Sequence, residues 1–221
     1  MTALEPDWPA PPNVRALTTL RGAAHNQEIS RYFGPVRVVE MRQVHGISVV
    51  DAGLQRDTAE ADACFSRSPG AACRVVTADC LPMLICNRQG TEVAAVHAGW
   101  RGLAAGVLEN ALDCLHSPGS ELLVWLGPAI SRKHFEVGEE VRAAFLEGAP
   151  DGLKTRLEAG FEVRGGRYLA DLYGIARARL EWAGISHIYG GQHCTFAEAE
   201  RFCSWRRDRE EGRMHSVIAF F

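Results

Sequence analysis

The chain has 221 residues, a length that fits one large domain, and 47% of them are hydrophobic while 23% are charged. This balance is ordinary for a soluble globular enzyme. The formal net charge of −3 argues against nucleic-acid binding, which usually leaves a basic footprint. No apolar run approaches the roughly 20 residues of a membrane span, and the N-terminus has no signal-peptide pattern. We therefore expect a cytoplasmic protein that binds neither nucleic acid nor membrane.

The cysteines indicate the same compartment. There are seven of them, an odd number, and they are scattered without any Cys-x-x-Cys pair. Such usage fits free thiols in a reducing environment better than a disulfide framework or a zinc ribbon.

Short β-type runs come first along the chain. Segments rich in Val, Ile and Leu predict strands at residues 36–40, 47–51, 74–77, 81–86 and 92–97. The Asn-Arg-Gln-Gly string at residues 87–90 suits a hairpin turn between the last two.

Helices then alternate with strands. Apolar side chains at helical spacing predict a helix over residues 103–115, ended by Pro118 and Gly119. A second helix is predicted at 139–146, and a third begins after Asp171 as its N-cap and ends before Gly184. Further strands are predicted at 122–126, 185–189 and 216–220, and residues 149–167 as variable surface structure. This order predicts an α+β domain with mixed layers, not a doubly wound sheet.

Three local strings place metal-binding side chains beside strand ends. They are Gln-Val-His-Gly at 43–46, Thr-Ala-Asp-Cys-Leu-Pro at 77–82 and His-Ala-Gly-Trp-Arg-Gly at 97–102. Two imidazoles and one thiolate, from His45, His97 and Cys80, form a zinc ligand set that leaves a fourth position open for water or substrate. Taken singly, a cysteine such as Cys80 is more often a core residue than a ligand, and a histidine such as His45 is more often a hydrogen-bonded turn residue. The glycines at 99 and 102 indicate a backbone held close to another group.

The ordered combination of strings resembles a known family. Besides the three above, the chain contains Trp-Leu-Gly-Pro-Ala-Ile at 125–130, Phe-Glu-Val-Gly at 135–138, Cys-Thr at 194–195 and Ser-Trp-Arg-Arg at 204–207. From about residue 36 to its end the chain resembles the purine nucleoside phosphorylase family, formerly named multicopper polyphenol oxidoreductases or laccases and also known as peptidoglycan editing factors.

The resemblance implies a fold, a metal site and an activity. The fold is a four-layer α/β/β/α sandwich, related to a toxin domain of the cysteine hydrolase type, in a single domain over residues 1–221. The metal ligands fall on His45, Cys80 and His97, with Zn²⁺ as the resident ion and Cu²⁺ as an ion bound in vitro. The implied reactions are phosphorolysis of adenosine, inosine and methylthioadenosine, and deamination of adenosine, in a monomer or weak homodimer.

The front of the chain departs from the family pattern. The family's Ser-Leu-Asn-Leu-Gly and Asn-Arg stretches are missing between the altered Thr-Leu-Arg-Gly string at 19–22 and His45. Residues 1–35 are therefore interpreted as a shortened, divergent segment, and the missing stretch is one that contributes to the pocket rim in the family.

Phosphorolysis needs positive groups to hold phosphate, and arginine's planar fork suits that anion. Arg21 and Arg101 are the first candidates, followed by Arg206 and Arg207. Asp79 and Gln43 are candidates for residues that contact the metal ligands, not the metal, and orient them. Asp79 would orient a ligand imidazole.

Other functions remain open at this point. A polyphenol oxidase would need several His-x-His motifs for oxygen reduction, and the chain contains none, so phenol oxidation is expected only as a side activity after copper substitution. Cys80 with His97 as its base would suit a hydrolase that edits cell-wall precursors. The third alternative is a metal-binding protein without turnover.

Overall fold

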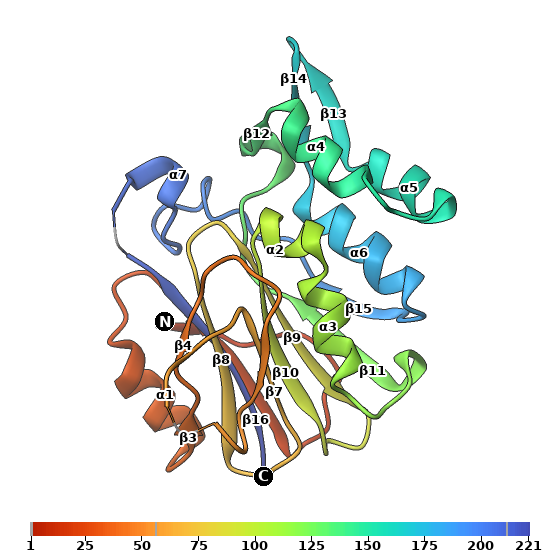
Figure 1. Cartoon of the computed structure of the whole chain (residues 1–221). Helices are drawn as coiled ribbons and strands as arrows, with labels where there is room; N and C mark the ends of the chain where they lie inside the picture. Colours follow the sequence, from red (N-terminus) through yellow and green to blue (C-terminus); the bar gives the residue numbers. More distant parts are fainter. Residues whose placement is uncertain (1, 56, 211) are drawn as a thin grey trace.

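Two β-sheets face each other at the centre of the molecule, and helices lie against both of their outer faces (Figure 1). The computed structural model describes residues 2–55, 57–210 and 212–221. The predicted mixed α/β single domain is confirmed. Within the described part of the chain, no helix combines the length and apolar character that crossing a bilayer requires.

The first sheet joins the two ends of the chain. Its order is β1-β2-β16-β8-β3, and all pairs are antiparallel except β3 with β8. The strands are β1 (Ala3–Leu4), β2 (Val14–Thr19), β16 (Met214–Phe220), β8 (Ala71–Thr77) and β3 (Arg37–Val38).

The second sheet contains the strands nearest the candidate site. Its order is β15-β11-β9-β10-β7-β5, with parallel pairs at its two edges and antiparallel pairs between them. The strands are β15 (His187–Gly190), β11 (Leu122–Leu126), β9 (Leu81–Asn87), β10 (Val93–Ala98), β7 (Ala63–Ser66) and β5 (Val49–Asp51).

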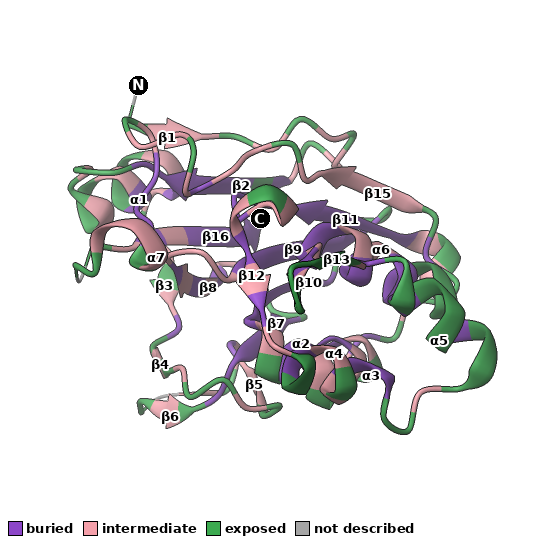
Figure 2. Cartoon of the chain, turned by 90° about the horizontal axis from the view of Figure 1, so that it is seen from above, coloured by how far each residue is buried: buried purple, intermediate pink, exposed green. Residues whose placement is uncertain are grey.

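The alternation of side chains along the strands builds the core. Leu84 and Trp125 of the second sheet pack between the sheets against Val75 and Ile218 of the first. Their neighbours in sequence point the other way, as successive residues of a strand must. This is why the central strands are buried on both faces (Figure 2).

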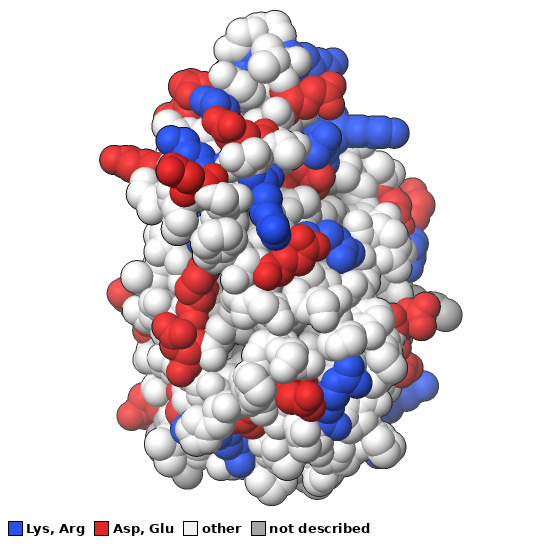
Figure 3. All heavy atoms as spheres, turned by 90° about the vertical axis from the view of Figure 1, so that its right-hand side faces the viewer, with Lys and Arg blue, Asp and Glu red and all other residues white. Residues whose placement is uncertain are grey.

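Helices cover the two outer faces. The helix α1 (His25–Phe33) packs Ile29 and Phe33 on the first sheet. On the second sheet lie α2 (Trp100–Ala105), α3 (Val107–Asp113), α4 (Glu139–Leu146), α5 (Asp151–Glu158) and α6 (Leu172–Trp182). Acidic and basic side chains are interspersed on the surface seen in Figure 3.

Smaller elements complete the chain. Two minor sheets pair β12 (Glu136–Val137), β14 (Arg167–Ala170) and β13 (Phe161–Arg164), and β4 (Met41–Arg42) with β6 (Ala59–Glu60). The short helices are η1 (Gly119–Glu121), η2 (Arg132–His134) and α7 (Trp205–Asp208).

Most predicted elements are present, and the differences have local causes. The strands at 81–86, 92–97 and 122–126, the helix at 139–146 and the Asp171 N-cap are confirmed to within a residue or so. The single helix predicted at 103–115 is wrong, because Gly106 adopts a left-handed φ of 104° and divides it into α2 and α3. Most of residues 149–167 are exposed, as predicted, and α5 and β13 lie in this surface segment.

Candidate metal centre

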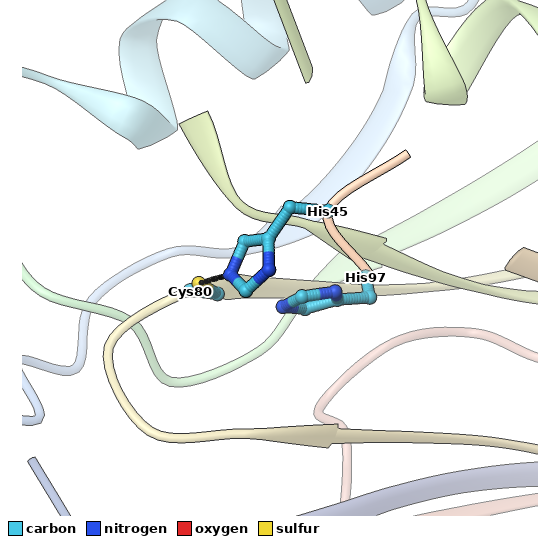
Figure 4. Close-up of side chains that lie close together, drawn as sticks. All are labelled: His45, Cys80 and His97. Atoms are coloured by element: carbon cyan, nitrogen blue, oxygen red, sulfur yellow. Dashed lines mark hydrogen bonds between the residues drawn. The ribbon is translucent and has the colours of Figure 1, made fainter. Parts of the chain in front are cut away.

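His45, Cys80 and His97 meet at one end of the second sheet. Their three donor atoms all lie within 4.8 Å of one another. The Cys80 sulfur is 3.7 Å from His45 Nε2, and the two imidazole rings are 4.8 Å apart between centroids, nearly edge to face. Figure 4 shows the two rings and the sulfur pointing toward one another.

The strand pairing explains why these residues meet. Cys80 immediately precedes β9 and His97 is the penultimate residue of β10, and the two strands pair antiparallel with His97 opposite Pro82. The start of one strand therefore lies beside the end of the next. His45 comes from the turn between β4 and β5, where its φ is 60°, a left-handed conformation that is uncommon outside glycine.

Asp62 connects the turn of His45 to the strand of His97. Its buried carboxylate accepts the backbone N–H of Val44 (3.1 Å), His45 (2.9 Å) and Gly46 (2.7 Å). One of its oxygens is also 2.7 Å from His97 Nδ1. With Nδ1 held by Asp62, His97 presents Nε2 to the cluster, the arrangement that carboxylates impose on metal-binding histidines.

The prediction that Asp79 orients a ligand imidazole is wrong, because Asp62 contacts His97 instead. The Asp79 carboxylate accepts Thr195 Oγ1 at 2.6 Å and the backbone N–H of Arg206 at 2.7 Å. Asp62 was missed because residues 63–66 were not predicted as a strand. An acidic residue directly before that apolar run is the signal that could have identified it.

Gln43 and Gly99 shape the space around the ligands. The Gln43 amide bonds the N–H and C=O of Val76 at 2.7 and 2.8 Å, so it anchors the turn of His45 to β8 without contacting a ligand ring. A methyl group at Gly99 would lie 2.7 Å from His45 Cδ2 and 3.0 Å from Cys80 Sγ. The close backbone approach expected of this glycine is confirmed.

The charges of the cluster are mutually dependent. Burial would raise the pKa of Cys80, but the hydrogen bonds and positive charge of His45 and His97 lower it to about 6. Burial would lower the pKa of His97, but its bonds to Asp62 and Cys80 raise it to about 9. Without a metal, Cys80 and His97 therefore form a thiolate–imidazolium pair at neutral pH.

The donor set and its spacing fit a tetrahedral ion. Bonds of about 2.0–2.3 Å from zinc to nitrogen and sulfur separate two ligand atoms by roughly 3.3–3.6 Å. The 3.7 Å contact between Cys80 and His45 is already close to this spacing. The widest separation of 4.8 Å would have to shorten by about 1 Å.

A cavity of about 730 Å³ opens above the cluster. Besides the three ligands, Gln43 and Asp79, its walls include four arginines and three aromatic side chains: Arg74, Arg101, Arg206, Arg213, Trp100, Phe135 and Trp205. Arg74 pairs with Glu40 at 2.8 Å. Among the described carboxylates, none forms an ion pair with Arg101 or Arg206, whose guanidinium groups lie over the rings of Trp100 and Phe135.

Two of the four arginines expected to bind phosphate lie elsewhere. Arg21 is not part of the cavity wall and pairs with Asp208 at 2.8 Å. Arg207 uses its guanidinium on Asp208 and on the carbonyls of Thr195, Phe196 and Phe202. All five of its N–H donors are thereby engaged, so Arg207 fixes the chain around residues 195–208.

Comparison with known proteins agrees with this architecture. The family model described as multi-copper polyphenol oxidoreductase laccase matches residues 22–220. The chain belongs to this family. A relative from Pseudomonas aeruginosa named purine nucleoside phosphorylase is 45% identical over 238 residues, covering 97% of each chain. The Escherichia coli relative named purine nucleoside phosphorylase YfiH is 49% identical over 185 residues, covering 83% of this chain and 74% of its own.

Two solved structures have the same fold. Protein NMB0706 of Neisseria meningitidis superposes with a TM-score of 0.90 at 40% identity, covering 100% of this chain and 99% of its own. YlmD of Geobacillus stearothermophilus superposes with a TM-score of 0.82 at 24% identity, over 100% and 96% of the two chains. The family name refers to several copper ions, whereas the described residues contain one cluster of three or more side chains that could bind a metal ion.

We expect the Cys80 thiol of the metal-free protein to titrate near pH 6. Thiolate absorbance at 240 nm, taken as the difference between wild type and Cys80→Ser, measures this. His97→Gln removes a donor and a positive charge, so the midpoint should move upward. His116→Gln, at an imidazole that is 76% exposed, should leave it unchanged. A wild-type midpoint at the ordinary thiol value would contradict the charge pairing.

Proposed function

We propose that the chain is a zinc-dependent purine nucleoside phosphorylase with adenosine, inosine and methylthioadenosine as substrates and adenosine deamination as a second reaction. The observation that carries the proposal is the convergence of three metal donors in a cavity that also holds three arginines, Arg101, Arg206 and Arg213, that pair with none of the described carboxylates. The names of the relatives support the phosphorylase part of the proposal.

In phosphorolysis, an oxygen of phosphate attacks C1′ of the nucleoside while the bond to the purine nitrogen breaks. Arg101 and Arg206 are the groups we assign to phosphate, because each presents a guanidinium in the cavity wall. Their positive charge offsets the anion, and the forked donors orient it. Arg21 and Arg207 have no part in this step.

The rest of the cavity suits a purine and an ion. The rings of Trp100, Phe135 and Trp205 line it, and flat aromatic faces bind a purine by stacking. Asp62 keeps the His97 ring and the turn of His45 in place for an ion, which we propose is Zn²⁺, with Cu²⁺ binding in vitro. When bound, the ion would lower the pKa of a coordinated water toward about 7, which would supply hydroxide for deamination at purine C6.

The proposal also covers the fold type, the N-terminal segment, the cellular location and the oligomeric state. The two sheets and their helices are interpreted as an α/β/β/α sandwich of the toxin-like cysteine hydrolase type, as the packing on both outer faces suggests. Residues 1–35 are proposed to be shortened. Two observations support this. The alignment with the Haemophilus influenzae relative covers both whole chains and runs over 248 residues, which is longer than the 221 residues of this chain. No described residue before Glu40 lines the cavity. We also propose that the protein is a cytoplasmic monomer or weak dimer. All seven cysteines are free, which supports a reducing compartment.

One observation favours a second candidate. The paired pKa shifts of Cys80 and His97 are those of an activated thiolate nucleophile, which would suit a hydrolase acting on cell-wall precursors. Metal content distinguishes the candidates. Stoichiometric zinc that is lost together with activity on chelation supports the phosphorylase, whereas full activity in metal-free protein supports the nucleophile.

We expect the purified protein to release adenine from adenosine only when phosphate is present, and to form inosine without phosphate. Both products, followed by chromatography, should disappear in Cys80→Ser and His97→Ala, because each variant removes one of three ligands. If His97→Ala retained both rates, the triad would not be the reaction centre.

Arg101→Ala should raise the KM for phosphate by roughly 10–100-fold, the effect of losing a charged hydrogen bond of about 1.5–3 kcal/mol. Steady-state phosphorolysis over a phosphate series measures it. Deamination, which uses no phosphate, should be little changed in the same variant. Arg21→Ala is the matched control and should keep the wild-type KM. Equal effects of the two variants would remove Arg101 from the phosphate site.

Asp62→Asn should weaken zinc binding by about 10–100-fold, since groups that orient metal-binding histidines have effects of this size. Competition with a chromophoric chelator measures the affinity. Glu60→Gln is the control, because Glu60 is two residues away, 54% exposed and paired with Arg42 on the surface. Unchanged affinity in Asp62→Asn would show that His97 needs no such support.

A further inference from the structure

A second cysteine and histidine meet outside the candidate metal centre. Cys194 follows β15 along the chain and His134 ends the short helix η2. The Cys194 sulfur lies 3.4 Å from His134 Nδ1. Neither residue lines the cavity of the metal centre.

Ser131 adds two hydrogen bonds to the same sulfur. Its hydroxyl lies 3.1 Å from Cys194 Sγ, and its backbone N–H donates to that atom at 3.4 Å. Hydrogen bonds that end on sulfur favour the thiolate over the thiol. The two groups of Ser131 therefore stabilise negative charge on Cys194, while His134 is placed to accept the proton.

The orientation of His134 is held by the loop that carries Cys194. The imidazole stacks on the ring of Phe196, with centroids 4.6 Å apart and planes at 19°. Cys194 itself is anchored, since its backbone N–H donates to Glu198 at 2.8 Å. Both partners are thus fixed in a geometry within reach for proton transfer.

Apart from Cys80 in the candidate metal centre, the other cysteines lack this environment. Cys64, Cys73, Cys86 and Cys203 are buried. Cys114 is partly exposed like Cys194, but its sulfur contacts the carbonyl of Asn110 at 3.3 Å, and burial followed by the charge of Asp113 raises its pKa. Cys114 is therefore a natural internal reference for a thiol of similar exposure without activation.

We propose that Cys194 is a nucleophilic thiol, activated by His134 and Ser131, and a site of covalent modification by small electrophiles. With an alkyl halide such as iodoacetamide, the thiol proton passes to His134 Nδ1 and the sulfur forms a bond to the methylene carbon. The carbon–iodine bond breaks and iodide leaves with its electron pair. The product is a thioether at Cys194, and no oxidant or further reactant is needed.

The test is timed labelling of the native protein with iodoacetamide at pH 7, followed by peptide mass spectrometry. Cys194 should be alkylated at least about tenfold faster than Cys114, because a base and two hydrogen-bond donors contact its sulfur. Cys80 is quantified as a separate peptide. Equal rates at Cys194 and Cys114, or no labelling of Cys194, would overturn the proposal.

The variant His134→Phe keeps a ring to stack on Phe196 and removes the base. It should lower the Cys194 rate several-fold and leave Cys114 unchanged. Continued protection of Cys64, Cys73 and Cys86, which are fully buried, verifies the fold. If that protection is lost, Ser131→Ala replaces this variant, and a several-fold lower Cys194 rate is expected. An unchanged rate in a folded variant would contradict the proposed activation.

Discussion

The buried carboxylate of Asp62 holds the turn of His45 and the ring of His97 in place at one end of the second sheet, where β7 pairs with both β5 and β10. It accepts three consecutive backbone N–H groups of the turn at residues 44–46 and contacts Nδ1 of His97. Burial favours the neutral form of such a group, but these bonds outweigh it and lower the pKa of Asp62. Loss of one partner from a buried charged pair typically costs about 3–5 kcal/mol. The positions of two of the three ligands depend on this one residue.

The second sheet positions the other parts of the site. Antiparallel pairing of β9 with β10 brings Cys80 beside His97, and burial on both faces makes those strands rigid. The absence of a side chain at Gly99 then lets His45 and Cys80 approach the backbone. Asp79 secures the opposite wall, because its carboxylate holds Thr195 and the start of α7. The cavity is therefore framed by strand ends that the core already fixes.

The four arginines considered for phosphate binding differ in what their guanidinium groups contact. Arg207 and Arg21 are engaged with Asp208, and Arg207 also ties together several backbone carbonyls. Arg101 and Arg206 face the cavity over aromatic rings. The neighbouring residues Arg206 and Arg207 of one Ser-Trp-Arg-Arg string thus have different surroundings, because the short helix α7 directs only the first toward the cavity. Sequence strings alone do not distinguish such a pair.

The sequence by itself determined the central strands and the Asp171 cap, because apolar runs and capping residues are local properties. It also indicated the three candidate ligands, through the ordered strings that resemble the family and not through residue type alone. It did not determine Asp62, the division of the helix at Gly106, or which arginines reach the cavity. Those depend on contacts between segments distant in the chain, such as residues 44–46 with Asp62 and Asp79 with Arg206. Only the tertiary structure brings such groups within hydrogen-bonding distance, where their charges and orientations are decided.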